Sequence, residues 1–204
     1  MTVNANEQIV EESLRRDDID VRPDEEKFRE LLLLVAEELK DDDFGGALKV
    51  NKVLYYAEFG HFRATGKPIT GARFRKLRMG PAPRFLGEHR DALVRSGAAK
   101  VVNRPFLGHT QHRLAPQRPV NRKLFSESEL QAVREAVTLL RGDTGTDASE
   151  RSHREPGWQM VGYGEDIPYV TALLPQEQPQ PTDRMRARMR ELAARAQSEG
   201  RLAQ

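Results

Sequence analysis

The segment 47–62 constrains the fold more than any other part of the chain. Its apolar residues, which include Val50, Leu54 and Phe59, fall on nearly every side of a helical projection. A helix at a protein surface keeps one polar face, so a helix that is apolar almost all round must be covered by other elements. The glycine and proline in residues 66–68 oppose continuation of the helix. We therefore expect the chain to fold around a central, mostly buried helix that ends near residue 66.

Periodicity and capping residues indicate further helices on either side of this segment. From Asp24 onward the apolar residues follow one helical stripe, and the acidic residues at its start suit the positive end of the helix dipole. Ser126 and Glu129 form a capping box, which predicts a helix that ends near Gly142. A short helix is expected over 146–153. The apolar positions of the two longer helices are Phe28, Leu31, Leu32, Val35 and Leu39, and then Leu130, Val133, Val137 and Leu140.

The middle of the chain is expected to be partly extended. Residues 69–79 alternate basic and apolar side chains, which favours a strand or an extended turn. The glycine and prolines of residues 80–83 are expected to break it. A helical stripe over 85–94, which Gly97 closes, is then followed by a further extended region.

Residues 99–103 and 110–114 flank Pro105 and Gly108, a pattern that predicts a small β-hairpin. The fold class is therefore α+β: a mainly helical single domain with a small β-hairpin or short antiparallel sheet. A helix followed by a hairpin gives it a winged-helix-like outline. We expect a flexible acidic tail at 1–22, the domain at 23–174, and a Pro-rich linker followed by a basic C-terminal helix at 175–204.

Composition excludes several classes of protein. The chain has no cysteine, so disulfide frameworks, thiolate nucleophiles and cysteine-ligated metal sites are ruled out, as is typical of a reducing cytoplasm. The longest aliphatic run is far shorter than a membrane span, and the N-terminus lacks the pattern of a signal peptide. We therefore expect a cytoplasmic protein without a membrane partner.

The net charge of +2 hides an uneven distribution of charge along the chain. Residues 1–43 carry 15 acidic and 6 basic side chains, whereas residues 44–204 carry 16 acidic and 27 basic side chains. Two interpretations remain open. Either the acidic N-terminal part lies near the basic part and screens it, or the basic part offers a surface to an acidic partner.

Motifs for catalysis and metal binding are weak. His109 and His112 are the most closely spaced of the five histidines, but no carboxylate lies at a recognisable ligand spacing, so no metal site is expected. Asp143-Thr144-Gly145 matches the aspartic protease tripeptide, but that chemistry needs two such loops in a β-rich frame. Serine hydrolase elbows and phosphate-binding glycine loops are absent from the sequence. We expect neither enzymatic activity nor a cofactor.

Cations dominate the segment that precedes Gly80. Four of them lie within six residues and alternate with apolar residues, so they could meet phosphates or acidic side chains. The alternative is an ordinary solvated strand face. With a fifth cation just beyond the glycine and prolines, the predicted partner-binding residues are Arg73, Arg75, Lys76, Arg78 and Arg84.

Four blocks of sequence resemble the Panacea domain, the SocA-like antitoxin family. The first is residues 48–62 followed by Gly66-Lys67-Pro68-Ile69-Thr70-Gly71-Ala72, and the second is Gly80-Pro81-Ala82-Pro83-Arg84. The others are Ser149-Glu150-Arg151-Ser152-His153-Arg154-Glu155-Pro156-Gly157-Trp158 and Gly164-Glu165-Asp166-Ile167-Pro168-Tyr169. The chain departs from the family pattern at Arg151, where leucine is usual, and at Arg78-Met79, where an aromatic residue is common.

The resemblance implies a bacterial or phage antitoxin that binds and neutralises a co-encoded toxin, or that presents the toxin to a protease. The implied partners are therefore a cognate toxin and, in the second case, a protease or its adaptor surface. Within the matching blocks we expect structural roles for Asn51, Lys52, Tyr55, Tyr56, Gly80, Pro81, His153, Trp158 and Pro168. The tyrosines are interpreted as core packing, and Trp158 as a buried anchor between the last helices.

The sequence thus favours a protein that forms a stoichiometric complex with a toxin. A DNA-binding regulator of winged-helix type is the alternative, since the basic segment and the hairpin could contact nucleic acid. A hydrolase of an unrecognised type is a third possibility.

Overall fold

The computed structural model describes residues 21–106 and 108–175. The predicted acidic tail, linker and basic C-terminal helix therefore lie outside the described residues, apart from Val21, Arg22 and Pro175. The elements, in chain order, are α2 (Glu25–Glu38), α3 (Ala47–Thr65), β1 (Phe74–Leu77), β2 (Gly80–Pro83), α4 (Leu86–Arg95), β3 (Ala99–Phe106), β4 (His109–Pro116), the 3-10 helix η1 (Arg122–Leu124), α5 (Glu127–Leu139), α6 (Gly145–Ser152), α7 (Pro156–Met160) and the 3-10 helix η2 (Tyr169–Leu173).

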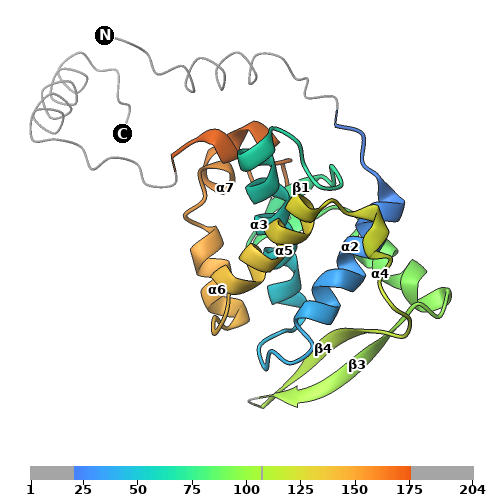
Figure 1. Cartoon of the computed structure of the whole chain (residues 1–204). Coiled ribbons are helices and arrows are strands. Elements are labelled where there is room, and N and C mark those ends of the chain that lie inside the picture. The colour runs from blue at the N-terminus through green and yellow to red at the C-terminus, as the bar shows by residue number, and fades with distance from the viewer. Residues whose placement is uncertain (1–20, 107, 176–204) are drawn as a thin grey trace, which may run out of the picture. The chain divides into compact units, whose positions relative to one another are not determined.

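Helix α3 is the centre of the described part, as predicted. It contacts α2, α5, α6, β2 and η2, so that little of its surface reaches solvent (Figure 1). Val53, Leu54 and Ala57 are fully buried. The helix ends at Gly66, whose φ of 72° is in the left-handed region that glycine adopts without strain.

Helix α2 is more enclosed than its sequence stripe predicted. Asp24 caps its N-terminus, since a side-chain oxygen accepts a hydrogen bond from the Lys27 backbone N–H at 2.9 Å. Leu33 and Leu34 lie off the predicted stripe but are also buried. Strand β4 and helices α3, α4 and α5 all pack on α2, so it is a core element of the domain.

The two strands β1 and β2 form a two-stranded antiparallel sheet, with Phe74 opposite Pro83 and Leu77 opposite Gly80. The prediction that residues 80–83 interrupt the extended segment was therefore wrong. Prolines are tolerated here because the outer edge of β2 has no ladder partner among the described residues, so a missing N–H on that edge costs little. Strand β2 is buried along its whole length.

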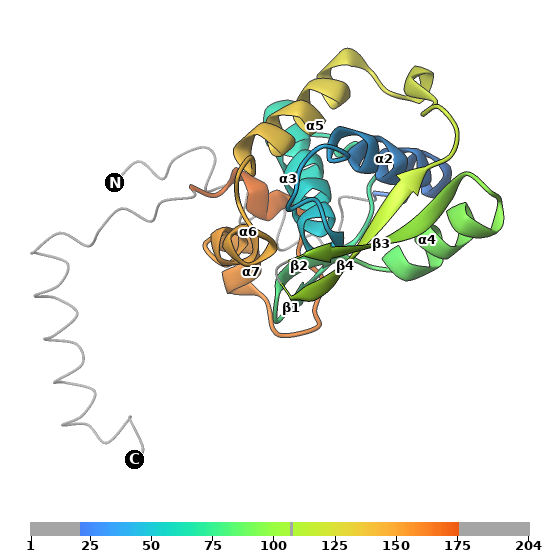
Figure 2. The ribbon, with the colours of Figure 1, turned by 90° about the horizontal axis from the view of Figure 1, so that it is seen from below.

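Strands β3 and β4 form the predicted hairpin, although each strand is longer than expected. Pro105 lies within β3, opposite Thr110, and not in the turn. The hairpin follows α4 and extends beneath α2 (Figures 1 and 2). The stripe predicted for α4 was only partly right, because Leu93 is buried whereas Phe85 precedes the helix and is 60% exposed.

The C-terminal part of the domain follows the predicted caps. Ser126 and Glu129 form both hydrogen bonds of a capping box at the start of α5. Thr144 caps α6 in the same way with Asp147, so the Asp143-Thr144-Gly145 tripeptide is a helix start. No helix was predicted for the segment that holds the short helix α7. The fold is thus a mainly helical α+β domain with small antiparallel sheets, as the sequence predicted.

Candidate functional site

Two of the five predicted partner-binding cations hold the segment that follows α7 against the β1–β2 sheet. The Lys76 ammonium lies 4.3 Å from the centre of the Trp158 ring and donates a hydrogen bond to the Val161 carbonyl at 3.0 Å. The Arg84 guanidinium pairs with Asp166 and donates to the Gly164 carbonyl at 3.2 Å. These two side chains already have partners within the domain.

The other cations do not gather into one patch. Arg73 and Arg78 are exposed at opposite ends of β1, about 16 Å apart along an extended chain. Arg75 lies between them and is partly buried. Arg73 does lie near Arg84, whose backbone N–H donates to the Arg73 carbonyl at 2.7 Å, and both line a small cavity of about 190 Å³ beside Phe85. A partner role for the five residues stays a prediction.

Several of the predicted structural residues meet where α3, α6 and the β1–β2 sheet pack together. Lys52 is 1% exposed, and its ammonium donates to the Pro81 carbonyl at 2.9 Å. Burial lowers the pKa of Lys52 from 10.5 to about 7. A methyl group on Gly80 would lie 2.8 Å from Lys52 Nζ and would overlap Ser152 Oγ. Only glycine therefore fits at the start of β2.

The remaining predicted structural residues have the following surroundings. Tyr55 packs on Phe59 at a ring distance of 4.3 Å, which agrees with core packing. Burial raises the pKa of Tyr55, and burial followed by the charge of Glu155 raises that of Tyr56. Asn51 is partly buried on α3, and the carbonyl of the exposed Pro168 accepts a hydrogen bond from the Thr171 hydroxyl at 2.7 Å.

Trp158 is partly buried and packs on the sheet and on α6, so the prediction of a buried anchor between the last helices was only partly right. Its ring stacks on His153 at 4.2 Å, and its indole N–H donates to the Leu77 carbonyl at 3.2 Å. Burial, followed by the charge of Lys52, lowers the pKa of His153. Trp158 thus joins α7 to β1.

We expect Trp158→Ala to lower the free energy of unfolding by about 2 kcal/mol, less than the 3–5 kcal/mol typical of a fully buried tryptophan. Trp158→Phe keeps the stacked ring and loses one hydrogen bond, so its expected cost is about 1 kcal/mol. Urea denaturation of the three proteins measures both values. Equal stability of Trp158→Ala and the wild type would show that the ring adds nothing to the fold.

Lys52 and Ser152 are the residues whose chemistry comes closest to that of a catalytic pair. An amine with a pKa near 7 could act as a base towards a serine hydroxyl. Both side chains are buried, however, and the Ser152 hydroxyl donates to the Ser149 carbonyl at 2.6 Å. A substrate in solution cannot reach either group in this conformation. Among residues 21–106 and 108–175, no three histidine or acidic residues are placed to hold a metal ion.

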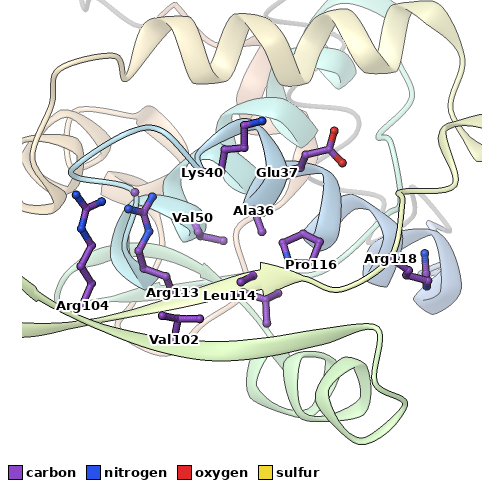
Figure 3. A pocket seen from close by; sticks show the side chains of 12 residues that line it. Ala36, Glu37, Lys40, Val50, Val102, Arg104, Arg113, Leu114, Pro116 and Arg118 are labelled. Carbon is purple, nitrogen blue, oxygen red and sulfur yellow. The ribbon is translucent and has the colours of Figure 1, made fainter.

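A groove between α2 and the β3–β4 hairpin is the largest open feature that we describe. Its volume is about 510 Å³, within the range of sites that bind ligand groups. Figure 3 shows the hairpin below and α2 above, with Val102 on one wall and Ala36 and Val50 on the other. The apolar lining residues are Ala36, Val50, Val102, Leu114, Ala115 and Pro116, and the charged ones are Glu37, Lys40, Arg104, Arg113 and Arg118.

Arginines fix the hairpin to α2 and to the loop that follows it. Arg113 donates to the carbonyls of Leu39 and Asp42, the latter at 2.8 Å. Arg104 pairs with Asp43 at 2.9 Å, and Arg118 pairs with the buried Glu30. Burial, and then the nearby charge of Arg104, lower the pKa of Arg113. The walls of the groove are thus held together by charged contacts at its ends.

The groove was not predicted from the sequence, although the charge pattern of the chain carries one signal of it. Residues 92–126 carry seven arginines and lysines and no acidic residue. This acid-free stretch contains the whole hairpin. An excess of positive charge of this kind is a signal, in the sequence, of a segment that meets acidic groups, and in the fold Arg104 and Arg118 do pair with Asp43 and Glu30.

These features define the class of the protein: a mainly helical α+β domain with an open, apolar and cation-rimmed groove and no accessible reactive pair among the residues described above. Residues 50–159 match the family model described as antitoxin SocA-like, Panacea domain. The match covers more than half of the chain, and the chain therefore belongs to the SocA-like antitoxin family. Searches of curated proteins and of solved structures gave no match. No helix among the described residues is long and apolar enough to cross a membrane.

Proposed function

We propose that this chain neutralises a co-encoded toxin by direct, stoichiometric binding. Membership of the SocA-like antitoxin family is the observation that carries the proposal. The geometry supports it because the open groove can take up protein side chains, whereas the buried Lys52 and Ser152 cannot meet a substrate. The antitoxin would act by covering the surface that the toxin needs for its own activity.

The groove alone is too small to hold a toxin tightly. Stable complexes of two proteins bury about 1,200–2,000 Å² in total, so the contact must extend over the hairpin and the neighbouring surface of α2. A few well-packed apolar residues at the centre of such a contact supply most of the binding free energy. Val102 and the apolar wall around it are suited to that role.

The experiment is to express the product of the gene adjacent to this one in cells, alone and together with this chain. We expect the product alone to stop growth and the two together to permit it, with a complex of fixed ratio in size-exclusion chromatography with light scattering. Normal growth without this chain, or rescue without a complex, would contradict direct neutralisation.

The same experiment separates occlusion from presentation to a protease. If the chain only covers the toxin, the amount of toxin in the cell stays constant when the chain is present. If the chain presents the toxin to a protease, the toxin disappears, and it returns in cells that lack the protease. We expect constant amounts of toxin, because an open groove with an apolar centre suits a lasting complex.

A further inference from the structure

We infer that the toxin docks in the groove between α2 and the hairpin, and that the docked part is an extended acidic segment that inserts an apolar side chain. This inference rests on the proposed function, since it names the site and the chemistry of the partner. The groove is lined by α2, α3 and the hairpin, so its shape is set by core elements and by the arginines at its ends.

The register of the hairpin determines which residues of β3 face the groove. Side chains alternate between the two faces of a strand. Of the β3 residues, Val102 and Arg104 line the groove and, two residues apart, share one face of the strand, whereas Val101 is not among the lining residues, although its cross-strand partner Leu114 is. Lys100 is two residues from Val102 and shares its face. Both valines are exposed, Val101 to 44% and Val102 to 37%, so neither is needed to fill the core.

The charges around the groove select an acidic partner. Its lining contains four cations and the single carboxylate of Glu37. Two of these cations, Arg104 and Arg118, already pair with Asp43 and Glu30, so the positive charge left to a partner comes mainly from Arg113 and from Lys100 on β3. Among the described residues, Lys100 has no ion-pair partner, and no acidic residue occurs in the stretch 92–126 to offset it. A segment with carboxylates on either side of an apolar residue would place its carboxylates near the cations at the ends of the groove and its apolar side chain against the apolar lining.

A nucleic acid fits the same groove less well. Phosphates gain nothing from the apolar lining of the groove, which includes Val50, Val102 and Leu114. The apolar lining is what distinguishes this groove from a phosphate-binding surface.

The test compares two substitutions on adjacent residues of one strand. Val102→Asp places a carboxylate on the groove face, and Val101→Asp makes the same change on the opposite face. The probe is the product of the adjacent gene made by cell-free translation, and its dissociation constant is measured by biolayer interferometry. We expect Val102→Asp to weaken binding about 30-fold or more, as loss of a central anchor does, and Val101→Asp to change it less than about threefold.

A second pair of variants tests the charge of the partner. Lys100→Glu reverses a charge on the groove face, whereas Lys123→Glu reverses one beyond the hairpin, in η1. At low salt Lys100→Glu should slow association about tenfold, and the difference from the wild type should shrink as salt is added, because surface charges steer the encounter of two proteins. Lys123→Glu should associate nearly as fast as the wild type.

Melting temperatures close to that of the wild type establish that all four variants are folded. If the wild type binds the toxin and Val102→Asp binds equally well, or Val101→Asp binds as poorly, the groove is not the docking site. If the wild type does not bind at all, the proposed function fails, and the identity of the partner fails with it. If the wild type binds the upstream DNA and Val102→Asp does not, the occupant of the groove is a nucleic acid. If the wild type self-associates and Val102→Asp does not, the occupant is a second copy of the chain.

Discussion

Gly80→Ala is expected to lower the free energy of unfolding by about 2–5 kcal/mol. Two costs add at this position. Gly80 has a φ of 86°, a conformation that costs other residues about 1–2 kcal/mol. The added methyl group would also overlap Ser152 Oγ and lie 2.8 Å from Lys52 Nζ, and overpacking of a core typically costs about 1–3 kcal/mol.

Gly97→Ala is the matched control for this prediction. Gly97 has a φ of 72°, but no atom lies within 4 Å of the position of the new methyl group. Gly97→Ala therefore has the conformational cost without the overlap, and its free energy of unfolding is expected to fall by about 1–2 kcal/mol. Guanidinium denaturation of both variants measures the difference. Equal losses would mean that the surroundings of Gly80 relax freely, so that only its backbone conformation requires glycine.

The stability of the protein should rise with pH between about pH 7 and pH 10 because of Lys52. The pKa of Lys52 is about 7 in the folded protein, against an ordinary value of 10.5. Between these values the unfolded chain binds a proton that the folded chain does not, so raising the pH removes a penalty on folding. From pH 7 to pH 9 the gain from this group is about 2 kcal/mol.

Lys52→Met isolates this contribution. Methionine has a similar length and no charge, so the free energy of unfolding of the variant should not rise with pH because of this residue. The variant should be more stable than the wild type near pH 7, and this difference should shrink as the pH rises. Lys123→Met, which removes an exposed lysine, should keep the wild-type dependence. Chemical denaturation at several pH values gives the curves. Parallel curves for Lys52→Met and the wild type would show that the buried amine is charged in the folded protein.

The longer helices could be predicted because their signals are local. Asp24, Gly66 and the pair Ser126 and Glu129 mark helix ends within a few residues of the bonds that they make. The strand β2 could not be predicted in the same way. Its two prolines are typical of a break, and they are tolerated only because a particular partner strand leaves their edge unpaired.

The candidate groove depends on contacts between distant parts of the chain. Val50 and Val102 face the same cavity although about fifty residues separate them, and Arg113 reaches carbonyls of a loop more than seventy residues away. Residue spacing carries no information on such contacts. Conversely, the cations of β1 are close in sequence but do not form one patch in the fold, since Lys76 packs on Trp158 whereas Arg73 and Arg78 are exposed at opposite ends of the strand.

The enclosed position of α2 has a practical consequence for shortened forms of the protein. The family match begins at residue 50, but Leu31 and Leu33 of α2 are fully buried, and the Asp24 backbone N–H donates to the Thr70 carbonyl at 2.8 Å. Beyond the other end of the match, the Tyr169 hydroxyl donates to the Ala72 carbonyl at 2.6 Å. A fragment cut to the matched residues would expose the apolar surface that these elements cover, and it should aggregate. The smallest fragment suited to crystallisation or binding studies therefore begins before Asp24 and extends through η2.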